Sequence, residues 1–267
     1  MKNRNGILKV VKNLAVKSVL VGAVISMQNA QAVSSYDLSS LTSITTDHVN
    51  SLLQTIAVGG AHHAYMPATA LGVLIGVDAG VDVTSFSLPS GFTDALVVAT
   101  GKTTAELPTS LFIPKLNIHK GLPGGIDLGI SWVGISDSGK TVLSAYGGDL
   151  KWSVINNLAL PSVAVRLGYT STVFSFLSTK TLAADVSVSK NLILLDPFLG
   201  AGVQRWSGAL DTSAGTGTLG VSSDGSGYTS YMYGGAMLKL GFLKLVAQAD
   251  YNTAGITSYG GKFSFGF

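Results

Sequence analysis

The last twelve residues of the chain, from Ile256 to Phe267, constrain its fold more than any other stretch. One set of alternating positions is mostly aromatic: Tyr259, Gly261, Phe263, Phe265 and Phe267. The other set is small or charged: Gly260, Lys262, Ser264 and Gly266. A period of two residues is typical of a β-strand. An aromatic face would suit lipid and a small, polar face would suit a barrel interior, so the stretch predicts a strand that crosses a membrane.

The composition agrees with a membrane-spanning sheet. Charged residues make up 12% of the 267 positions, whereas a soluble domain carries about 25%. After the N-terminus, no stretch has the roughly 18 apolar residues of a spanning helix. Strands are the other way to satisfy backbone groups in hydrocarbon, and such strands must close into a barrel. The chain has no cysteine, which excludes disulfides and thiolate metal sites.

Residues 1–32 predict a signal peptide. Its positive residues are Lys2, Arg4, Lys9, Lys12 and Lys17. An apolar run over residues 18–27 and the triplet Ala30-Gln31-Ala32 follow, which places the cleavage after Ala32. The run is too short for an uncleaved anchor helix, which is the alternative. Cleavage takes Lys+Arg from 17 to 12 against 14 Asp+Glu, a net charge of about −2, so we expect no nucleic-acid partner.

Residues 33–69 predict a helical segment ahead of the barrel. Its apolar residues recur at mostly helical spacing: Leu38, Leu41, Ile44, Val49, Leu52, Leu53 and Ile56. Asp37 is a candidate N-cap, and Gly59-Gly60 would end the helix. The segment could plug the lumen, cover the periplasmic mouth or dock on a partner. A helix that only packs would show the same amphipathic pattern.

The adjacent residues His62 and His63 invite a metal-site interpretation. Neighbouring side chains of an extended chain point to opposite faces, and the other histidines, His48 and His119, are isolated in the sequence. A zinc site needs three or four convergent ligands. We therefore predict a polar linker here, with no metal and no cofactor.

Residues 70–267 predict an antiparallel transmembrane β-barrel in the all-β class. The first strand alternates from Leu71 to Thr84. Two stretches break the pattern as long loops, 88–108 with a short helix at 94–99, and 208–227. Shorter turns are predicted at 120–125, 136–140, 156–161, 178–180, 190–196, near 241 and at 252–255. These divide the chain into ten strands, although eight or twelve also fit. A secreted β-sandwich is the alternative, but the strand length and low charge disfavour it.

Alternation, aromatic rims and the closing Phe267 resemble the outer-membrane β-barrel proteins of Gram-negative bacteria. The resemblance implies an outer-membrane location, contact with membrane lipid, and recognition of Phe267 by the barrel-assembly machinery. A helical segment ahead of the barrel is also similar in layout to hydrophobic-substrate transporters with an N-terminal plug. These motifs identify the class and no subfamily.

Ten charged residues share the small or polar phase of their strands. A lysine or arginine facing lipid near the midplane costs about 2–4 kcal/mol. We therefore predict that these residues face the lumen: Asp78, Asp82, Asp127, Asp149, Lys151, Arg166, Asp185, Lys244, Asp250 and Lys262. They could form a salt-bridged core or line a narrow conduit, for which wall glycines would make room. Arg205 has the opposite phase and predicts either a side chain that snorkels to the headgroups or a β-bulge.

These features favour a small porin-like channel, or a transporter of a small solute or lipid, with an N-terminal plug. The alternative is a structural or adhesive barrel that acts through its two long loops. An enzyme is not favoured, because no lipase-type G-x-S-x-G stretch is present. We assign no catalytic residue, and the sequence does not identify the ligand.

Overall fold

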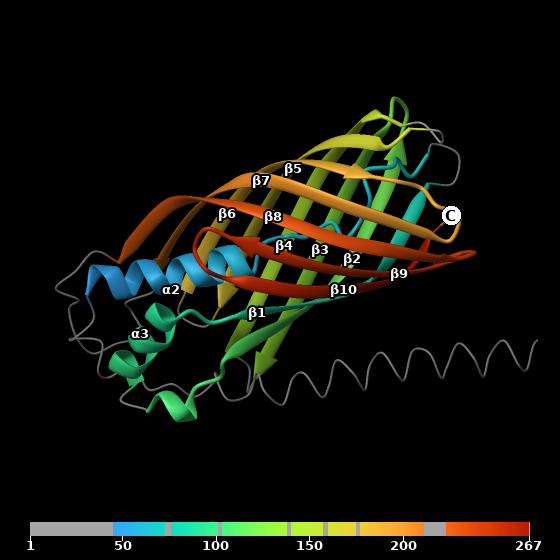
Figure 1. Cartoon of the computed structure of the whole chain (residues 1–267). Coiled ribbons are helices and arrows are strands. Elements are labelled where there is room, and N and C mark those ends of the chain that lie inside the picture. Colours follow the sequence, from blue (N-terminus) through green and yellow to red (C-terminus); the bar gives the residue numbers. More distant parts are fainter. Residues whose placement is uncertain are drawn as a thin grey trace, which may run out of the picture. The chain divides into compact units, whose positions relative to one another are not determined.

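A computed structural model shows a closed antiparallel barrel of ten strands (Figure 1). Each strand pairs with its neighbours in sequence, and β1 closes the barrel against β10. The predicted fold class and strand number are confirmed. The structure describes residues 45–72, 76–100, 103–137, 140–156, 160–174, 177–210 and 223–266. The predicted signal peptide, Asp37 and Phe267 lie outside the described residues.

At one end of the barrel all four connections are short, and the other end carries the two longest connections, between β1 and β2 and between β7 and β8, beside shorter ones. Their bounds are β1 Val77–Ser87, β2 Ser110–Leu122, β3 Ile126–Asp137, β4 Lys140–Ile155, β5 Ser162–Phe174, β6 Leu177–Ser189, β7 Leu195–Leu210, β8 Asp224–Leu240, β9 Leu243–Asn252 and β10 Thr257–Gly266. Between β1 and β2 lie helix α3, Ser90–Thr100, and the short 3-10 helix η3, Thr104–Glu106. The predicted helix at 94–99 thus lies within a longer one that begins four residues earlier.

Three predicted boundaries are wrong. β1 begins at Val77, and Leu71 precedes it in a segment without regular structure. The turn predicted at 178–180 belongs to β6, where Thr179 and Thr181 alternate inward like the residues after them. The loop predicted at 208–227 is shorter, because β7 extends to Leu210 and β8 starts at Asp224. Small and hydroxylated residues occur on the inner face of this barrel as well as in loops, so composition alone misplaced these ends.

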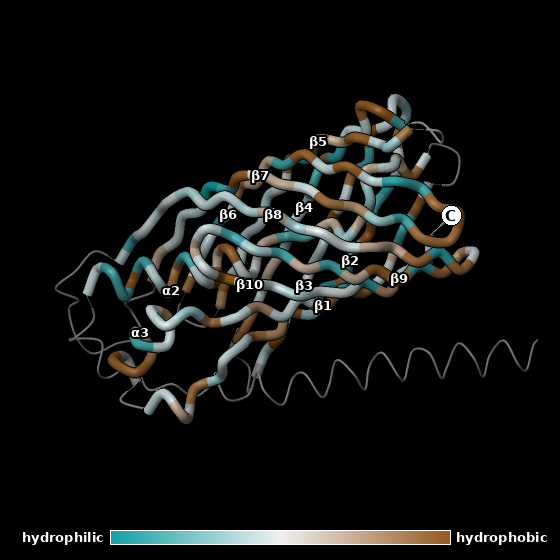
Figure 2. The backbone as a smooth tube through the Cα atoms, viewed as in Figure 1, coloured by the Kyte–Doolittle hydropathy of each residue, from teal (hydrophilic) through white to brown (hydrophobic). Residues whose placement is uncertain are grey.

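The outward face of the barrel is apolar in the manner of a lipid-facing surface. Large outward side chains are about half exposed on strand after strand: Leu116, Ile130, Trp132, Tyr146, Trp152, Leu167, Leu182, Leu199, Val203, Met232 and Tyr259. Brown, hydrophobic positions recur along the strands in Figure 2. Arg205 shares this outward face and lies over the ring of Tyr228, 5.8 Å from its centroid. Its strand needs no bulge at that point, as the pairing with β8 continues through it.

Helix α2, Thr46–Gly59, packs inside the end of the barrel that carries the longer connections. Its N-cap is Thr45, whose side chain accepts from the backbone N–H of His48 while the His48 ring accepts from the N–H of Thr45. The helix contacts β5 to β8, β1 and α3, and its predicted end at Gly59-Gly60 is confirmed. None of the helices in the described part of the chain is long and apolar enough to cross a membrane.

Residues 60–72 then run along the barrel interior to the opposite end. The backbone N–H of His62 donates to Thr170 in the middle of β5, over 2.8 Å. Further along, Ser153 donates to the carbonyl of Ala68, and the N–H of Leu71 donates to Asp127 at the start of β3. We call residues 46–72 the plug. It enters at the end with the longer connections, so α2 does not cover the short-turn mouth, which was one of the predicted alternatives (Figure 1).

If the outward face contacts lipid, Leu167→Arg should lower the free energy of unfolding by about 2–4 kcal/mol, because Leu167 lies near the middle of β5. Leu160 is the matched control. It is equally exposed, at 57%, but lies in the turn before β5, where the same change should cost about 0–1 kcal/mol. Urea unfolding from lipid vesicles, followed by tryptophan fluorescence, measures both. Equal costs would contradict the membrane placement.

Candidate functional site: a polar interior and its histidine cluster

The structure turns all ten predicted lumen residues toward the barrel interior. Nine of them are buried, and Lys244 is partly buried. Strand register then places opposite charges beside each other. Asp127 pairs with Lys151 across β3 and β4, with 3.0 Å between Oδ2 and Nζ. Arg166 pairs with Asp185 across β5 and β6, at 2.7 Å.

Asp78, on β1, binds two lysines. Its carboxylate oxygens lie 2.6 Å from Nζ of Lys262 and 3.2 Å from Nζ of Lys244. Asp185 also has several partners. Besides Arg166, the hydroxyls of Tyr231 and Tyr233 donate to it over 2.7 and 2.8 Å. Buried carboxylates are costly unless they are paired and hydrogen-bonded, so these partners stabilise the inward charges.

Two of the inward lysines bind the plug. Lys115 on β2 donates to the carbonyl oxygens of Gly60 and Ala61, over 2.9 and 2.8 Å. Lys151 donates to those of Pro67 and Thr69, over 2.8 and 3.0 Å. These bonds satisfy backbone carbonyls of a segment that has no regular structure and lies inside the barrel. The wall therefore holds the plug largely through backbone atoms.

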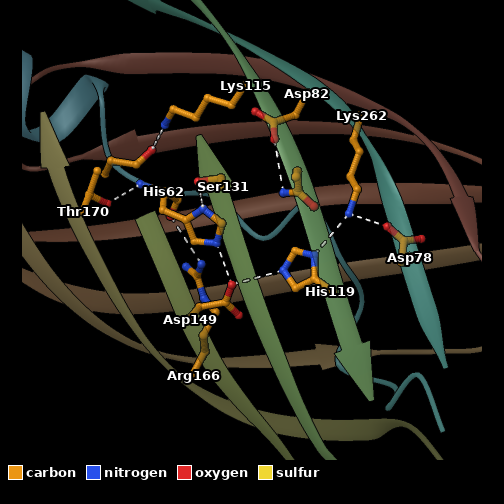
Figure 3. Close-up of polar contacts among 12 residues, drawn as sticks. His62, Asp78, Asp82, Lys115, His119, Ser131, Asp149, Arg166, Thr170 and Lys262 are labelled. Carbon is orange, nitrogen blue, oxygen red and sulfur yellow. Dashed lines mark hydrogen bonds and ion pairs between the residues drawn. The ribbon is translucent and has the colours of Figure 1, made fainter. Parts of the chain in front are cut away.

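The inner face contains one cluster that differs from the ion pairs, formed by His62, His119 and Asp149 (Figure 3). His62 comes from the plug, His119 from β2 and Asp149 from β4. Both imidazoles direct Nε2 at Oδ1 of Asp149, over 2.6 Å for His62 and 3.1 Å for His119. Nδ1 of His62 lies 2.8 Å from the hydroxyl of Ser131. All of these side chains are buried.

The expectation that His62 has no potential co-ligands nearby is wrong. The rings of His62 and His119 lie 6.1 Å apart, and Asp149 lies between them. Sequence separation hid the cluster, because the register of β2, β3 and β4 brings His119 and Asp149 to either side of Gly129, and the path of the plug adds His62. The other adjacent histidine, His63, points elsewhere, with Nε2 3.6 Å from Asp250.

Sequence reasoning also missed inward residues on β2. Lys115, Asn117 and His119 alternate with outward Leu116 and Ile118. That phase was present in the sequence and would have identified all three as interior residues.

Wall glycines make room for the plug and for the charged side chains. A Cβ on Gly147 would lie 2.8 Å from Cβ of His62, and one on Gly260 would collide with the hydroxyl of Tyr65. A Cβ on Gly129 would collide with the side chains of His119 and Asp149. The predicted space beside these glycines is therefore occupied.

The fold and its surface define the class of protein: a ten-stranded transmembrane β-barrel whose interior holds a segment of its own chain. No protein-family model matches the chain, and no curated protein matches it. The solved structures that it is similar to include bacterial outer-membrane barrels.

The N-terminal barrel domain of Pseudomonas aeruginosa OprF is 11% identical, with 70% of this chain and 97% of that chain covered and a TM-score of 0.33. Neisserial surface protein A is 10% identical, with 72% and 97% covered and a TM-score of 0.33. LpxR from Salmonella typhimurium is 9% identical, with 70% and 100% covered and a TM-score of 0.39. Likeness at this level assigns no function, which has to be argued from the residues of this chain.

Removing one member of a buried ion pair should be costly. Lys151→Met leaves Asp127, which is fully buried, without its cation and frees two plug carbonyls. We expect a loss of about 3–5 kcal/mol in the free energy of unfolding. The double change Asp127→Asn with Lys151→Met should recover part of that loss, since no charge is then left unpaired. Urea titration of the three proteins gives the comparison, and a loss below about 1 kcal/mol for Lys151→Met would show that the pair is hydrated.

Proposed function

We propose that this chain is a narrow outer-membrane channel for a small polar solute, closed by its own N-terminal plug. The observation that carries the proposal is the chemistry of the wall behind the plug. The wall meets residues 60–72 with lysines, hydroxyls and carboxylates, among them Lys115, Lys151, Thr170 and Asp127. Those are the groups that a water-filled lumen exposes.

A plug that never left the lumen would be more stable if the wall around it were apolar. Buried ion pairs can often be replaced by well-packed hydrophobic residues at no cost or with a gain of about 1–4 kcal/mol. The described interior has an apolar wall around α2, where Leu52, Leu53 and Ile56 are buried, and again beside Tyr65, which packs with Phe198, Met237 and Val246. Along the rest of residues 60–72 the wall contacts are polar. That wall could accept water in place of the plug, because each lysine–carbonyl bond can be exchanged for a bond to water.

The inward charges suggest the kind of solute. Seven aspartates and six lysine or arginine residues face the described interior: Asp78, Asp82, Asp127, Asp149, Asp185, Asp196, Asp250, Lys115, Lys151, Arg166, Lys239, Lys244 and Lys262. The two signs are interspersed and nearly balanced, so the lumen should not select strongly by charge. A polar wall favours a small hydrophilic solute over a lipid.

Orientation follows from the usual construction of outer-membrane barrels, with short turns in the periplasm and longer connections outside. On that basis α2 lies at the outer mouth, and residues 60–72 run inward toward the periplasm. Opening would require residues 60–72, α2 or both to leave the lumen. A barrel that never conducts would instead favour the structural or adhesive alternative.

A disulfide between plug and wall tests the gate, since the chain has no cysteine of its own. The hydroxyls of Thr69 and Ser189 lie 3.3 Å apart, so Thr69→Cys with Ser189→Cys should form a disulfide with little movement. We expect the oxidised protein to be silent in planar bilayers and to recover discrete conductance steps on reduction. The control is Val173→Cys with Ser178→Cys, which joins the wall strands β5 and β6 on their outward face and leaves the plug free. Steps that persist in the oxidised Thr69–Ser189 protein would exclude movement of this part of the plug as the gate.

A side chain placed where the plug rests should favour the open form. Gly260→Ala puts a methyl group into the hydroxyl of Tyr65, which is itself bonded to Thr84. We expect a higher open probability than in the wild-type channel, measured as the fraction of time spent conducting. Gly234→Ala is the matched control, because its methyl group would meet nothing nearer than 3.8 Å. An open probability equal in both variants would count against the plug as the closing element.

A further inference from the structure

We infer that His62, His119 and Asp149 form a site for a divalent transition-metal ion, for which Zn²⁺ is the natural probe. One ligand atom from each residue lies within 4.8 Å of the other two. Two imidazole nitrogens and one carboxylate oxygen are donors that Zn²⁺ accepts, and three protein ligands leave one position for water. The site stands on its own geometry and does not depend on whether the barrel conducts.

The two histidine–aspartate distances are close to those of a metal site, and the two imidazole nitrogens lie within 4.8 Å of each other. With Zn–N and Zn–O bonds of about 2.0–2.2 Å, ligand atoms at tetrahedral angles lie roughly 3.3 Å apart. Nε2 of His119 is 3.1 Å from Oδ1 of Asp149, and Nε2 of His62 is 2.6 Å from the same oxygen. A shift of His62 by several tenths of an ångström would admit the ion. His62 belongs to the plug segment without regular structure, which can make that shift.

An unsatisfied atom at the same place points independently to a ligand. Oδ2 of Asp149 is buried and has no hydrogen-bond partner, and the Asp149 side chain is only 1% exposed. The other oxygen is bonded to the two imidazoles. A buried carboxylate with a free oxygen is costly, and a divalent cation bound to this carboxylate would supply the positive charge that it lacks.

The surroundings of the two imidazoles have opposite effects on metal binding. The Ser131 hydroxyl lies 2.8 Å from Nδ1 of His62 and can accept a hydrogen bond from it. With the proton on Nδ1, the lone pair of Nε2 is available to a metal ion. Nζ of Lys262 lies 3.5 Å from Nδ1 of His119. If His119 bound metal through Nε2, its Nδ1–H would face this ammonium group, and the positive charge of Lys262 would repel the cation. Lys262 also pairs with Asp78. Metal affinity should therefore increase when Lys262 loses its charge.

Calorimetric titration of the refolded, untagged chain with Zn²⁺ tests the site, and Co²⁺ provides a visible spectrum that reports imidazole and carboxylate coordination. We expect one ion per chain, at least tenfold weaker binding for His119→Gln and for Asp149→Asn, and tighter binding for Lys262→Met. His63→Gln is the matched control, because it removes the neighbouring plug histidine outside the cluster. No binding by the wild type, or equal binding by wild type and Asp149→Asn, would overturn the inference. Lys262→Met keeps all three ligands, so it remains informative if a ligand variant fails to fold.

Because the site joins the plug to two wall strands, Zn²⁺ should also hold the plug in place. Amide hydrogen exchange of residues 60–66 should slow on Zn²⁺ addition in the wild type and stay unchanged in His62→Gln. This readout needs no conductance, so a silent channel with slowed exchange would reject the proposed function and keep the metal site. Zn²⁺ binding that leaves exchange equal in the two proteins would show that His62 is not a ligand.

Discussion

The charges on the inner face of the barrel determine what else the interior can hold. A buried carboxylate is costly unless a cation or several hydrogen-bond donors lie beside it, and seven aspartates are buried in the described interior. The barrel satisfies most of them through its register, which sets Asp127 opposite Lys151 and Arg166 opposite Asp185. A slip of one residue between two strands would turn these side chains toward lipid. The ion pairs and the outward apolar face therefore specify the same register.

The plug depends on the same polar wall. The lysines that pair with aspartates, or lie opposite them on the neighbouring strand, also donate hydrogen bonds to the plug. Lys151 bonds Asp127 and two plug carbonyls, and Lys115 bonds two more. An ammonium group has three donors, so one lysine can serve wall and plug at once. Hydrogen bonds between strands and plug thus stabilise the plug, together with the apolar packing of Tyr65 against Phe198, Met237 and Val246.

The barrel could be predicted from the sequence because its signal is local. Alternation along single strands, low charge and turn residues gave the fold class and the strand number, and the phase of residues such as Asp82 and Lys262 predicted their side of the wall. Strand ends were less accurate near 178 and 208, because glycine, serine and threonine mark both loops and this inner face. The partners of each charge could not be predicted, because they depend on register. The cluster of His62, His119 and Asp149 depends additionally on where the plug runs, which no local pattern encodes.

The plug is held partly by backbone bonds and partly by side-chain fit, and these have different consequences. Bonds from Lys115 and Lys151 to carbonyls would tolerate many side chains in residues 60–69, since every residue offers a carbonyl. His62 and Tyr65 are different, because Gly147 and Gly260 leave room for them and their polar atoms bond Asp149 and Thr84. These two side chains fix the position of the plug along the lumen. A segment lacking these two side chains would keep the backbone bonds to the wall but lose the contacts that are specific to one position, so the fit at His62 and Tyr65 sets where the plug lies along the lumen.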